Sequence, residues 1–348
     1  MKAAIWHQAK DVRVENIPLK AHKDNEVVIR VAWAGICGSD LHEYLEGPIF
    51  IPVGHKDPLT ADQAPLVLGH EFSGIVTEIG SQVTQFKIGD HVAVNPTITY
   101  GKSSDSVDIY DGYNFIGLGC DGGLAEFVNV PEANLYHLPS DFPLRLAATI
   151  EPTAVAVQAI KEGALKFGQT VAIFGAGPIG VLIAAAAKAA GATKIIVVDL
   201  SVTRLQKAVE LGATNTINPV ETDALKKIHQ LAPGGVDVSF EVAGVQATFE
   251  QAISATRPRG KMVIVAIYGH PIEFNPMRLM NAGVQLTSTI AYSRETFKQT
   301  VALVSQRQIN TEPVITKEIA LDDILEKGFK ALTTDKTQAK ILIKLSGE

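Results

Sequence analysis

The sequence predicts an α/β protein built from a β-rich N-terminal part and a doubly wound parallel sheet. Short alternating segments separated by turns dominate the residues before Glu151, as in β-rich domains. After Glu151, apolar β runs alternate with helical segments, which is typical of a parallel sheet covered by helices on both faces. The length of 348 residues suits about two domains.

The N-terminal part is rich in glycine, proline and valine, and its apolar residues alternate with polar ones. This pattern predicts strands at Val27–Ala32, Gly74–Ile79, His91–Val94 and Ala125–Val130. The stretch Glu46–Pro65 contains four prolines. We predict a loop there, because proline lacks a backbone donor and interrupts a helix.

The second part repeats a strand–helix alternation. Strands are predicted at Thr170–Phe174, Lys194–Asp199, Asn215–Ile217, Val236–Glu241 and Lys261–Ala266. Helices are predicted at Thr153–Glu162, Val181–Ala190, Arg204–Leu211, Ala224–Leu231 and Thr248–Ala255, and the tail adds a helix at Glu295–Val304 and a strand at Lys340–Lys344. We place this domain at residues 153–287 and the β-rich domain at 1–152 and 288–348.

The composition disfavours several classes of partner. Acidic residues number 37 and basic residues 31, giving a formal net charge of −6, so we expect neither nucleic acid nor a membrane as partner. The start lacks a signal-peptide core, and no uninterrupted apolar run of about 18 residues occurs. We therefore expect a cytoplasmic protein. Two cysteines, Cys37 and Cys120, are too few for a disulfide framework.

A glycine-rich segment suggests a dinucleotide site. Gly175-Ala176-Gly177-Pro178-Ile179-Gly180 fits G-x-G-x-x-G, follows a predicted strand and opens a predicted helix. Gly175 permits the tight turn, Gly177 lets a pyrophosphate approach the backbone, and Gly180 allows close packing of helix and strand. Pro178 and Ile179 open the helix, whose amide groups favour the pyrophosphate anion. This context predicts a Rossmann domain.

The next strand ends at Asp199, which can accept hydrogen bonds from the adenosine ribose. A carboxylate there would repel the additional phosphate of NADP, so we expect NAD. Arg204 works against that preference, because a nearby arginine can accommodate a phosphate. The alternative is a structural glycine turn followed by a surface aspartate.

Three residues are candidate ligands of a catalytic zinc ion: Cys37, His70 and Glu151. Three protein ligands and one open position are typical of catalytic rather than structural zinc. Each residue alone also has an ordinary explanation as core filler, a satisfied histidine or a solvated carboxylate. No local spacing such as C-x-x-C joins them, so the residues alone leave the metal site open.

Several blocks of sequence resemble the zinc-containing medium-chain alcohol and polyol dehydrogenases. They are Gly35–His42, Gly69–Gly74, Gly89–Val92 and the glycine-rich segment, which occur in the order of that family. The resemblance covers essentially the whole chain. It implies a GroES-like N-terminal catalytic domain, a Rossmann domain for NAD, and a C-terminal segment that returns to the first domain.

The resemblance also implies roles for the metal ligands. Cys37 and His70 match zinc ligands of the family, and Glu151 matches the acidic ligand of its polyol and butanediol branch. Glu71 matches a position that ligates zinc in some relatives and stands behind it in others. We prefer Glu151 as third ligand and treat Glu71 as the alternative or as an exchange partner. Asp40 resembles the partner that orients the histidine.

The chain departs from many relatives at their second zinc site, which four closely spaced cysteines hold. Residues 95–119 contain no cysteine, and Cys120 stands alone. We therefore expect one catalytic zinc per subunit and no structural zinc. The loop Thr97–Gly123 is expected to replace the cysteine lobe.

A closer resemblance concerns the substrate. Leu41–Pro52, His55, Pro58–Thr60 and Phe115–Leu118 resemble the bacterial (R,R)-2,3-butanediol dehydrogenase branch. This implies interconversion of (R,R)-2,3-butanediol and acetoin, together with diacetyl-type ketones and other small vicinal diols.

The same resemblance implies that Ser39 receives the proton of the substrate hydroxyl and that His42 passes it to solvent. A turn hydroxyl and an ordinary loop histidine are the alternatives for these two residues. Candidate walls of a small substrate pocket are Tyr44, Phe50, Ile51 and Phe115.

Two other functions remain open. One is a sorbitol-like polyol dehydrogenase or an L-threonine dehydrogenase of the same family. The other is a non-catalytic nucleotide-binding protein, although all three candidate ligands are present. The family resemblance further implies a homodimer or homotetramer, without favouring either.

Overall fold

The computed structural model describes residues 1–101, 106–335 and 337–346. The chain divides into two compact units. Unit 1 comprises Met1–Glu151, Ser293–Gln306 and Ile315–Glu348, and unit 2 comprises Pro152–Tyr292 and Arg307–Val314. The boundaries of the units thus differ from the predicted domain boundaries by a few residues. In addition, the segment Arg307–Val314 belongs to unit 2.

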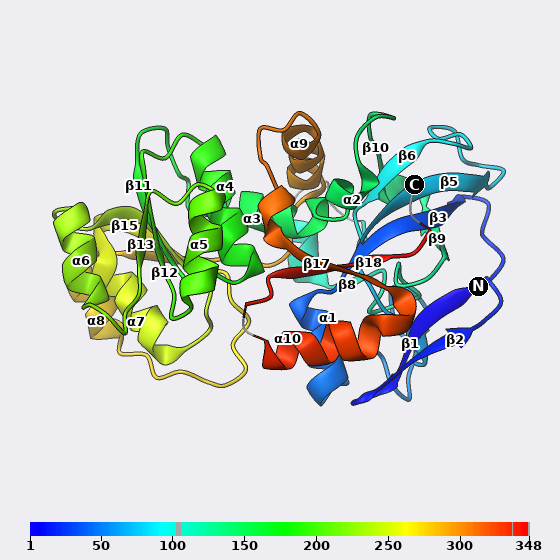
Figure 1. Cartoon of the computed structure of the whole chain (residues 1–348), viewed down its shortest axis with the longest axis horizontal. Coiled ribbons are helices and arrows are strands. Elements are labelled where there is room, and N and C mark those ends of the chain that lie inside the picture. The colour runs from blue at the N-terminus through cyan, green and yellow to red at the C-terminus, as the bar shows by residue number, and fades with distance from the viewer. Residues whose placement is uncertain (102–105, 336, 347–348) are drawn as a thin grey trace. The chain divides into compact units, whose positions relative to one another are not determined.

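Unit 1 is built around a seven-stranded sheet with the order β10-β6-β5-β3-β18-β17, in which β9 also pairs with β3 (Figure 1). Its strands are β3 (Glu26–Gly35), β5 (Glu71–Ile79), β6 (His91–Val94), β9 (Phe127–Pro131), β10 (Leu135–His137), β17 (Ile315–Ala320) and β18 (Lys340–Lys344). β18 is antiparallel to β3 and parallel to β17. A strand from late in the sequence therefore completes the N-terminal unit.

Two small sheets and several helices complete unit 1. The sheets have the orders β2-β1-β4 and β7-β8, with β1 (Lys2–Gln8), β2 (Asp11–Asn16), β4 (Leu66–Val67), β7 (Thr97–Thr99) and β8 (Tyr113–Phe115). The helices are α1 (Gly38–Glu46), α2 (Leu144–Ala147), α9 (Arg294–Ser305), α10 (Lys330–Thr334), the 3-10 helices Ser106–Asp111, Glu132–Asn134 and Leu321–Asp323, and the π-helix Ile324–Phe329.

Unit 2 is a six-stranded, entirely parallel sheet with the order β13-β12-β11-β14-β15-β16. Its strands are β11 (Thr170–Phe174), β12 (Lys194–Val198), β13 (Asn215–Ile217), β14 (Val236–Glu241), β15 (Thr256–Ile264) and β16 (Gln285–Ser288). The strand order reverses between β11 and β14, which is the doubly wound arrangement.

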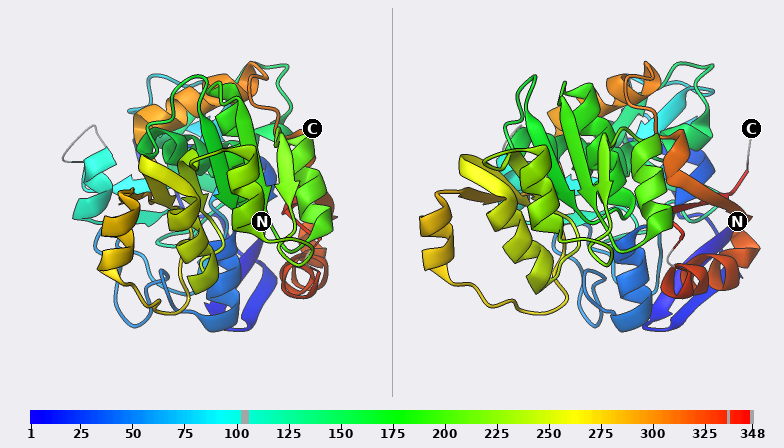
Figure 2. Two further views of the ribbon diagram at one scale, coloured as in Figure 1. Left: turned by 90° about the vertical axis from the view of Figure 1, so that its left-hand side faces the viewer. Right: turned by 60° about the vertical axis from the view of Figure 1, so that its left-hand side comes forward.

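Helices cover both faces of this sheet (Figure 2). They are α3 (Ile150–Glu162), which begins in unit 1, α4 (Pro178–Ala189), α5 (Val202–Glu210), α6 (Ala224–Leu231), α7 (Gln246–Ala255), α8 (Pro276–Ala282) and the 3-10 helix Glu312–Val314. α4 contacts α5, and α6 contacts α7. The apolar sides of α6 and α7 join the strands in one buried cluster that includes Ile228, Phe249 and Phe174.

Several predicted elements are confirmed to the residue: the strands Thr170–Phe174, Asn215–Ile217, Val236–Glu241, His91–Val94 and Lys340–Lys344, and the helix Ala224–Leu231. Several others start earlier than predicted, among them α4 and β15. α4 begins at Pro178, because proline suits the first turn of a helix. β15 runs over Thr256–Ile264 rather than Lys261–Ala266. Its first residues are mostly polar, so the apolar pattern of the sequence indicated only its second half.

The sequence prediction missed α1, although the predicted loop after it is confirmed in that residues 47–65 contain no helix or strand. The predicted replacement of the cysteine lobe by Thr97–Gly123 includes residues 102–105, which lie outside the described residues. Among the described residues, none of the helices is long and apolar enough to cross a bilayer.

Candidate active site

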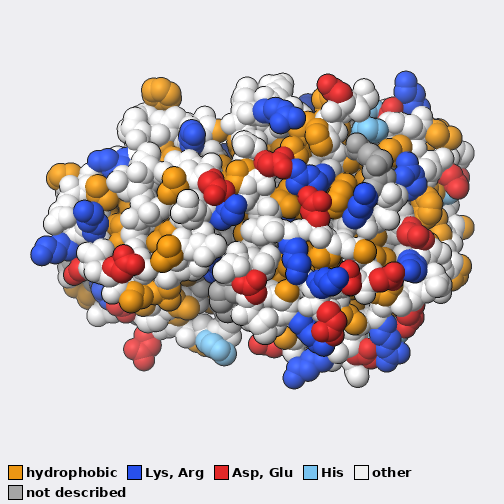
Figure 3. Space-filling view, in the orientation of Figure 1, with side chains coloured by type: hydrophobic (Ala, Val, Ile, Leu, Met, Phe, Trp, Pro, Cys, Tyr) orange, Lys and Arg blue, Asp and Glu red, His pale blue; other side chains and the backbone are white. Residues whose placement is uncertain are grey.

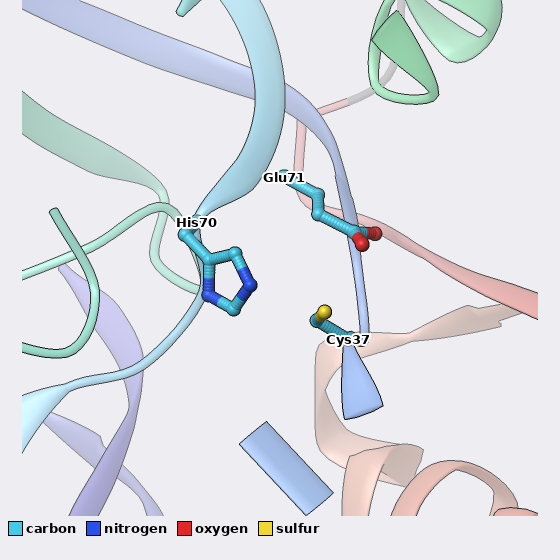
Figure 4. Close-up of side chains that lie close together, drawn as sticks. All are labelled: Cys37, His70 and Glu71. Atoms are coloured by element: carbon cyan, nitrogen blue, oxygen red, sulfur yellow. The ribbon is translucent and has the colours of Figure 1, made fainter. Parts of the chain in front are cut away.

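Two of the predicted metal ligands, Cys37 and His70, lie together with the alternative third ligand, Glu71, in unit 1 (Figure 4). Cys37 lies between β3 and α1, His70 directly precedes β5, and Glu71 is the first residue of β5. One ligand atom from each lies within 4.8 Å of the other two. His70 and Glu71 are buried, and Cys37 is half-buried. The sheet thus brings together residues that the sequence separates by more than thirty positions.

Asp40 lies against both Cys37 and His70, the two predicted ligands for which the sequence offers no alternative. Its Oδ2 accepts a hydrogen bond from the backbone nitrogen of Cys37 at 2.9 Å. Its Oδ1 lies 3.5 Å from Nδ1 of His70. Both of these last atoms are buried without a hydrogen-bond partner among the described residues. This geometry fits a zinc ion on the other imidazole nitrogen, because zinc-bound histidines commonly direct their second nitrogen to a carboxylate.

The electrostatics of the site also favour a cation. Burial lowers the pKa of His70, but the charges of Asp40 and Cys37 outweigh it and hold that pKa well above its usual value. The surroundings of His70 therefore stabilise positive charge. Together with the sulfur, nitrogen and oxygen donors, this fits the ligand preferences of zinc.

Glu71 is held by a lysine from the other end of the sequence. Nζ of Lys340, on β18, donates hydrogen bonds to Oε1 and Oε2 of Glu71 at 2.7 and 2.6 Å and to the carbonyl oxygen of Ile36 at 3.1 Å. Both charged side chains are almost fully buried. Burial lowers the pKa of Lys340, but Glu71, Cys37 and Glu151 outweigh it and raise that pKa, so the ammonium stays charged.

Glu151 is buried at the start of α3. It is close enough to raise the pKa of Lys340, but it is not a member of the convergent cluster of Cys37, His70 and Glu71. The predicted choice between Glu151 and Glu71 as third ligand therefore stays a prediction.

The two predicted relay residues share one side of α1. Oγ of Ser39 lies 3.1 Å from Nε2 of His70, in hydrogen-bonding distance. His42 follows three residues later and is exposed, and residues three apart are neighbours on a helix surface. α1 thus places a hydroxyl beside His70 and an exposed imidazole one turn further on.

The candidate substrate walls occupy different environments. The ring of Phe115 lies 5.9 Å from the ring of His70, measured between centroids. Tyr44 stacks on Phe329 with centroids 5.0 Å apart. Ile51 belongs to the buried core of unit 1, and Phe50 packs against that core. Among these four candidates, the ring of Phe115 is therefore the one that lies beside His70.

The glycine loop of unit 2 has the geometry that a dinucleotide needs. Gly175 has φ of 109°, in the left-handed region that favours glycine. A Cβ on Gly180 would clash with the carbonyl oxygen of Gly175, so glycine permits this close approach. A Cβ on Gly177 would meet open space. Pro178 and Ile179 form the first turn of α4, whose amide groups offer an anion site.

Asp199 follows β12 and is tied to the glycine loop. Its Oδ2 accepts a hydrogen bond from the backbone nitrogen of Ala176 at 2.7 Å, and its Oδ1 accepts one from Ser201 at 2.8 Å. Nε of Arg204, in the first turn of α5, is buried without a hydrogen-bond partner among the described residues. These positions fit an adenosine ribose beside the loop.

Sequence reasoning missed Lys340 as a residue of the site. Its signal was a lysine directly before the apolar residues Ile341–Ile343, where a buried charge needs a partner. The partner lies 269 residues away in the sequence, so the pairing could not be found from local pattern.

Two family models match the chain. The model described as Alcohol dehydrogenase GroES-like domain matches residues 23–140. The model described as Zinc-binding dehydrogenase matches residues 178–306.

Individual relatives align over almost the full length. The chain is 43% identical over 346 residues to the (R,R)-butanediol dehydrogenase of Bacillus subtilis (strain 168), with 99% of each chain covered. It is 32% identical over 350 residues to the sorbitol dehydrogenase of the same strain, covering 99% of this chain and 97% of the relative. The crystal structure of 2R,3R-butanediol dehydrogenase from Bacillus subtilis has a TM-score of 0.93, 42% identity and 99% coverage of both chains.

These matches confirm the predicted family and the predicted combination of a GroES-like domain with a Rossmann domain. They extend through the segments that carry Cys37, His70 and the glycine loop. Zinc and a nicotinamide dinucleotide are thus the cofactors that the fold and the family support. The chain belongs to the zinc-binding, GroES-like alcohol dehydrogenases.

Proposed function

We propose that this chain is an NAD-dependent zinc dehydrogenase that interconverts (R,R)-2,3-butanediol and acetoin, and that it accepts related small vicinal diols and hydroxyketones. The observation that carries the proposal is the cluster of Cys37, His70 and a carboxylate with Ser39 beside it. The substrate class follows from full-length similarity at 43% identity to a butanediol dehydrogenase, against 32% for a sorbitol dehydrogenase.

We further propose Glu151 as the third zinc ligand. Both carboxylate oxygens of Glu71 accept hydrogen bonds from Lys340, so the charge of Glu71 already has a cationic partner. Glu151 is buried and electrostatically coupled to the same lysine. The predicted single zinc per subunit is supported by the cysteine count, since Cys120 is the only other cysteine in the sequence.

Competition for zinc with a chelator tests the third ligand. Glu151→Gln is expected to weaken zinc binding more than Glu71→Gln, because the ligand itself is lost. Inductively coupled plasma analysis of zinc retained at increasing chelator concentration measures the difference. The opposite ranking would make Glu71 the ligand.

The chain's own residues account for proton transfer in this proposal. When bound, zinc supplies a Lewis acid and NAD supplies the hydride acceptor. Ser39 takes the proton of the substrate hydroxyl, and His42 passes it from the exposed side of α1 to solvent. Asp40 fixes the orientation of His70 and of the Cys37 backbone.

Acetoin reduction is the direct test of the activity. Oxidation of NADH with acetoin, followed by chiral chromatography, is expected to yield (R,R)-butanediol from (R)-acetoin. Sorbitol and L-threonine with NAD are expected to react far more slowly. A higher kcat/KM for either of them would contradict the proposed substrate.

Variants of the two cysteines separate an enzyme from a non-catalytic nucleotide-binding protein. Cys37→Ser is expected to lose both zinc and turnover, whereas Cys120→Ser, the matched control, keeps both. Metal analysis that finds no zinc in the wild-type protein would instead support the non-catalytic alternative.

We also propose that the protein forms a homodimer or homotetramer in the cytoplasm. Within the described sheet β16 is a terminal strand, and such a strand offers unpaired backbone groups to a second copy. Nearby apolar side chains are exposed, namely Met277, Met280 and Ile290. Size-exclusion chromatography with light scattering measures the assembly, and a monomer would contradict the proposal.

The proposed cytoplasmic location is supported by the two cysteines, which are both free, as is usual in a reducing compartment.

A further inference from the structure

A buried carboxylate, Glu241, lies at the C-terminal end of β14 and was not among the predicted cofactor residues. It is 0% exposed. Its Oε1 accepts hydrogen bonds from the backbone nitrogens of Ala243 and Gly244, both at 2.9 Å, and from the hydroxyl of Thr248 at 2.8 Å. Its Oε2 accepts one from the hydroxyl of Tyr268 at 2.6 Å. Four neutral donors thus hold a buried charge, an arrangement that costs free energy unless every bond is made.

Glu241 stands at the point where the sheet reverses its strand order. It pairs in register with Phe174, the last residue of β11, and the nitrogen of Val242 donates to the Phe174 carbonyl at 2.9 Å. A Cβ on Gly175 would lie 3.1 Å from the nitrogen of Ala243. The loop of residues 242–244 therefore packs directly against the glycine loop, where dinucleotides cross an open parallel sheet.

The same residue also holds the loop that follows β15. Its carbonyl oxygen accepts hydrogen bonds from the nitrogens of Val265 and Ala266 at 2.9 and 3.1 Å. Tyr268 lies two residues beyond, and its hydroxyl closes the contact on the carboxylate. Burial and the neighbouring Glu241 raise the pKa of Tyr268, so the phenol stays protonated and donates. One residue thus braces two neighbouring loops.

These two loops lie on the side of the sheet away from Asp199. Asp199 follows β12 and fits the adenosine ribose, while β14 and β15 lie beyond β11 in the strand order. In a doubly wound sheet, the second half of a dinucleotide extends over that side. We propose that Glu241 and Tyr268 are positioning residues for the nicotinamide half of NAD(H), acting through the loops after β14 and β15; this rests on the NAD(H) binding of the proposed function.

Binding of two related ligands tests the proposal on the full-length protein. NADH carries the nicotinamide ring and ADP-ribose lacks it. In Tyr268→Phe and Glu241→Gln, the dissociation constant of NADH is expected to rise about tenfold, the effect of losing one hydrogen bond to a charged group. The dissociation constant of ADP-ribose is expected to stay within about twofold of wild type, because Asp199 and the glycine loop are unchanged. Isothermal titration calorimetry measures both.

Asp237 on the same strand provides the matched control. It accepts hydrogen bonds from Thr170 and Arg257. It lies near the N-terminal end of β14, whereas Glu241 lies at the C-terminal end of the same strand. Asp237→Asn is expected to leave the ratio of the two dissociation constants unchanged even if it lowers the melting temperature.

Two results would overturn the inference. Equal weakening of NADH and ADP-ribose would show a general structural role, and unchanged NADH binding would show no role. Should Glu241→Gln fail to fold, Tyr268→Phe decides, since it removes only a hydroxyl and keeps the ring. A wild-type protein that binds ADP-ribose but not NADH would contradict the proposed function itself.

Discussion

At the scale of single residues, a buried ion pair joins Lys340 to Glu71. It lies next to the cluster of Cys37 and His70, and both partners are almost fully buried. The family blocks led the sequence analysis to Cys37, His70 and, as the alternative third ligand, Glu71. The sequence could not predict the lysine, because a contact between residues 269 positions apart leaves no local pattern.

Breaking this ion pair is expected to destabilise unit 1. Lys340→Met leaves the Glu71 charge buried without its partner, which should lower the free energy of unfolding by about 3–5 kcal/mol. The double variant Lys340→Met/Glu71→Gln should recover part of the loss. Urea unfolding of metal-free protein followed by tryptophan fluorescence measures this. Both tryptophans, Trp6 and Trp33, are buried in unit 1.

Asp199 is expected to set the preference for NAD. Asp199→Asn removes a charged acceptor beside the adenosine ribose, so KM for NAD should rise about tenfold or more. KM for NADP should fall, because the repulsion of its additional phosphate by Asp199 is relieved. Arg204, in the first turn of α5, can then pair with that phosphate. The ratio of kcat/KM for the two cofactors is the measurement. An unchanged ratio would place the selectivity elsewhere.

At the scale of elements, the sequence predicted the strands of the parallel sheet better than the helix of the active site. β11, β13 and β14 were predicted to the residue. β11 is a short apolar run of the kind that buried parallel strands form. α1 was missed because its buried residues are two carboxylates, Asp40 and Glu43. A helix whose buried side is acidic shows no apolar periodicity.

Asp237, near the start of β14, is expected to make unit 2 sensitive to acid. Burial raises its pKa, but hydrogen bonds from Thr170 and the Arg257 guanidinium outweigh burial and keep the pKa below its ordinary value of 3.8. The bonds therefore stabilise the folded state above about pH 4, and this contribution is lost as the pH falls through the lowered pKa.

Asp237→Asn removes that dependence. The variant is expected to be less stable than wild type at pH 6 and to approach it near pH 3. Circular dichroism of urea unfolding at the two pH values measures the difference. A constant difference between the two proteins would contradict the assignment.

For the whole molecule, the candidate residues for zinc and those for NAD lie in different units. The cluster of Cys37, His70 and Glu71 belongs to unit 1, and the glycine loop and Asp199 belong to unit 2. On the face shown in Figure 3, acidic and basic side chains are interspersed. The two-part α/β architecture was predictable because each part has its own sequence periodicity.

Removing zinc is expected to separate these two binding functions. Treatment with a chelator should abolish turnover and lower the melting temperature of unit 1, because a ligand that binds only the folded state stabilises it. NADH binding, measured by calorimetry, should change by less than about twofold. Restored turnover after zinc is added back is the control. Loss of NADH binding together with zinc would show that the metal is needed for the cofactor fold.

The position of β18 in its sheet has a consequence for synthesis. Its Lys340 bonds to Ile36, 304 residues earlier in the chain, and the strand lies between β3 and β17. Domains usually complete their folding in the order in which they leave the ribosome. Here all the strands of the parallel sheet emerge before β18 does. The segment Trp33–Gly35 of β3 is therefore synthesised long before β18, the strand with which it pairs. Until β18 emerges, that side of the segment is an exposed strand edge of the kind that can pair with another chain.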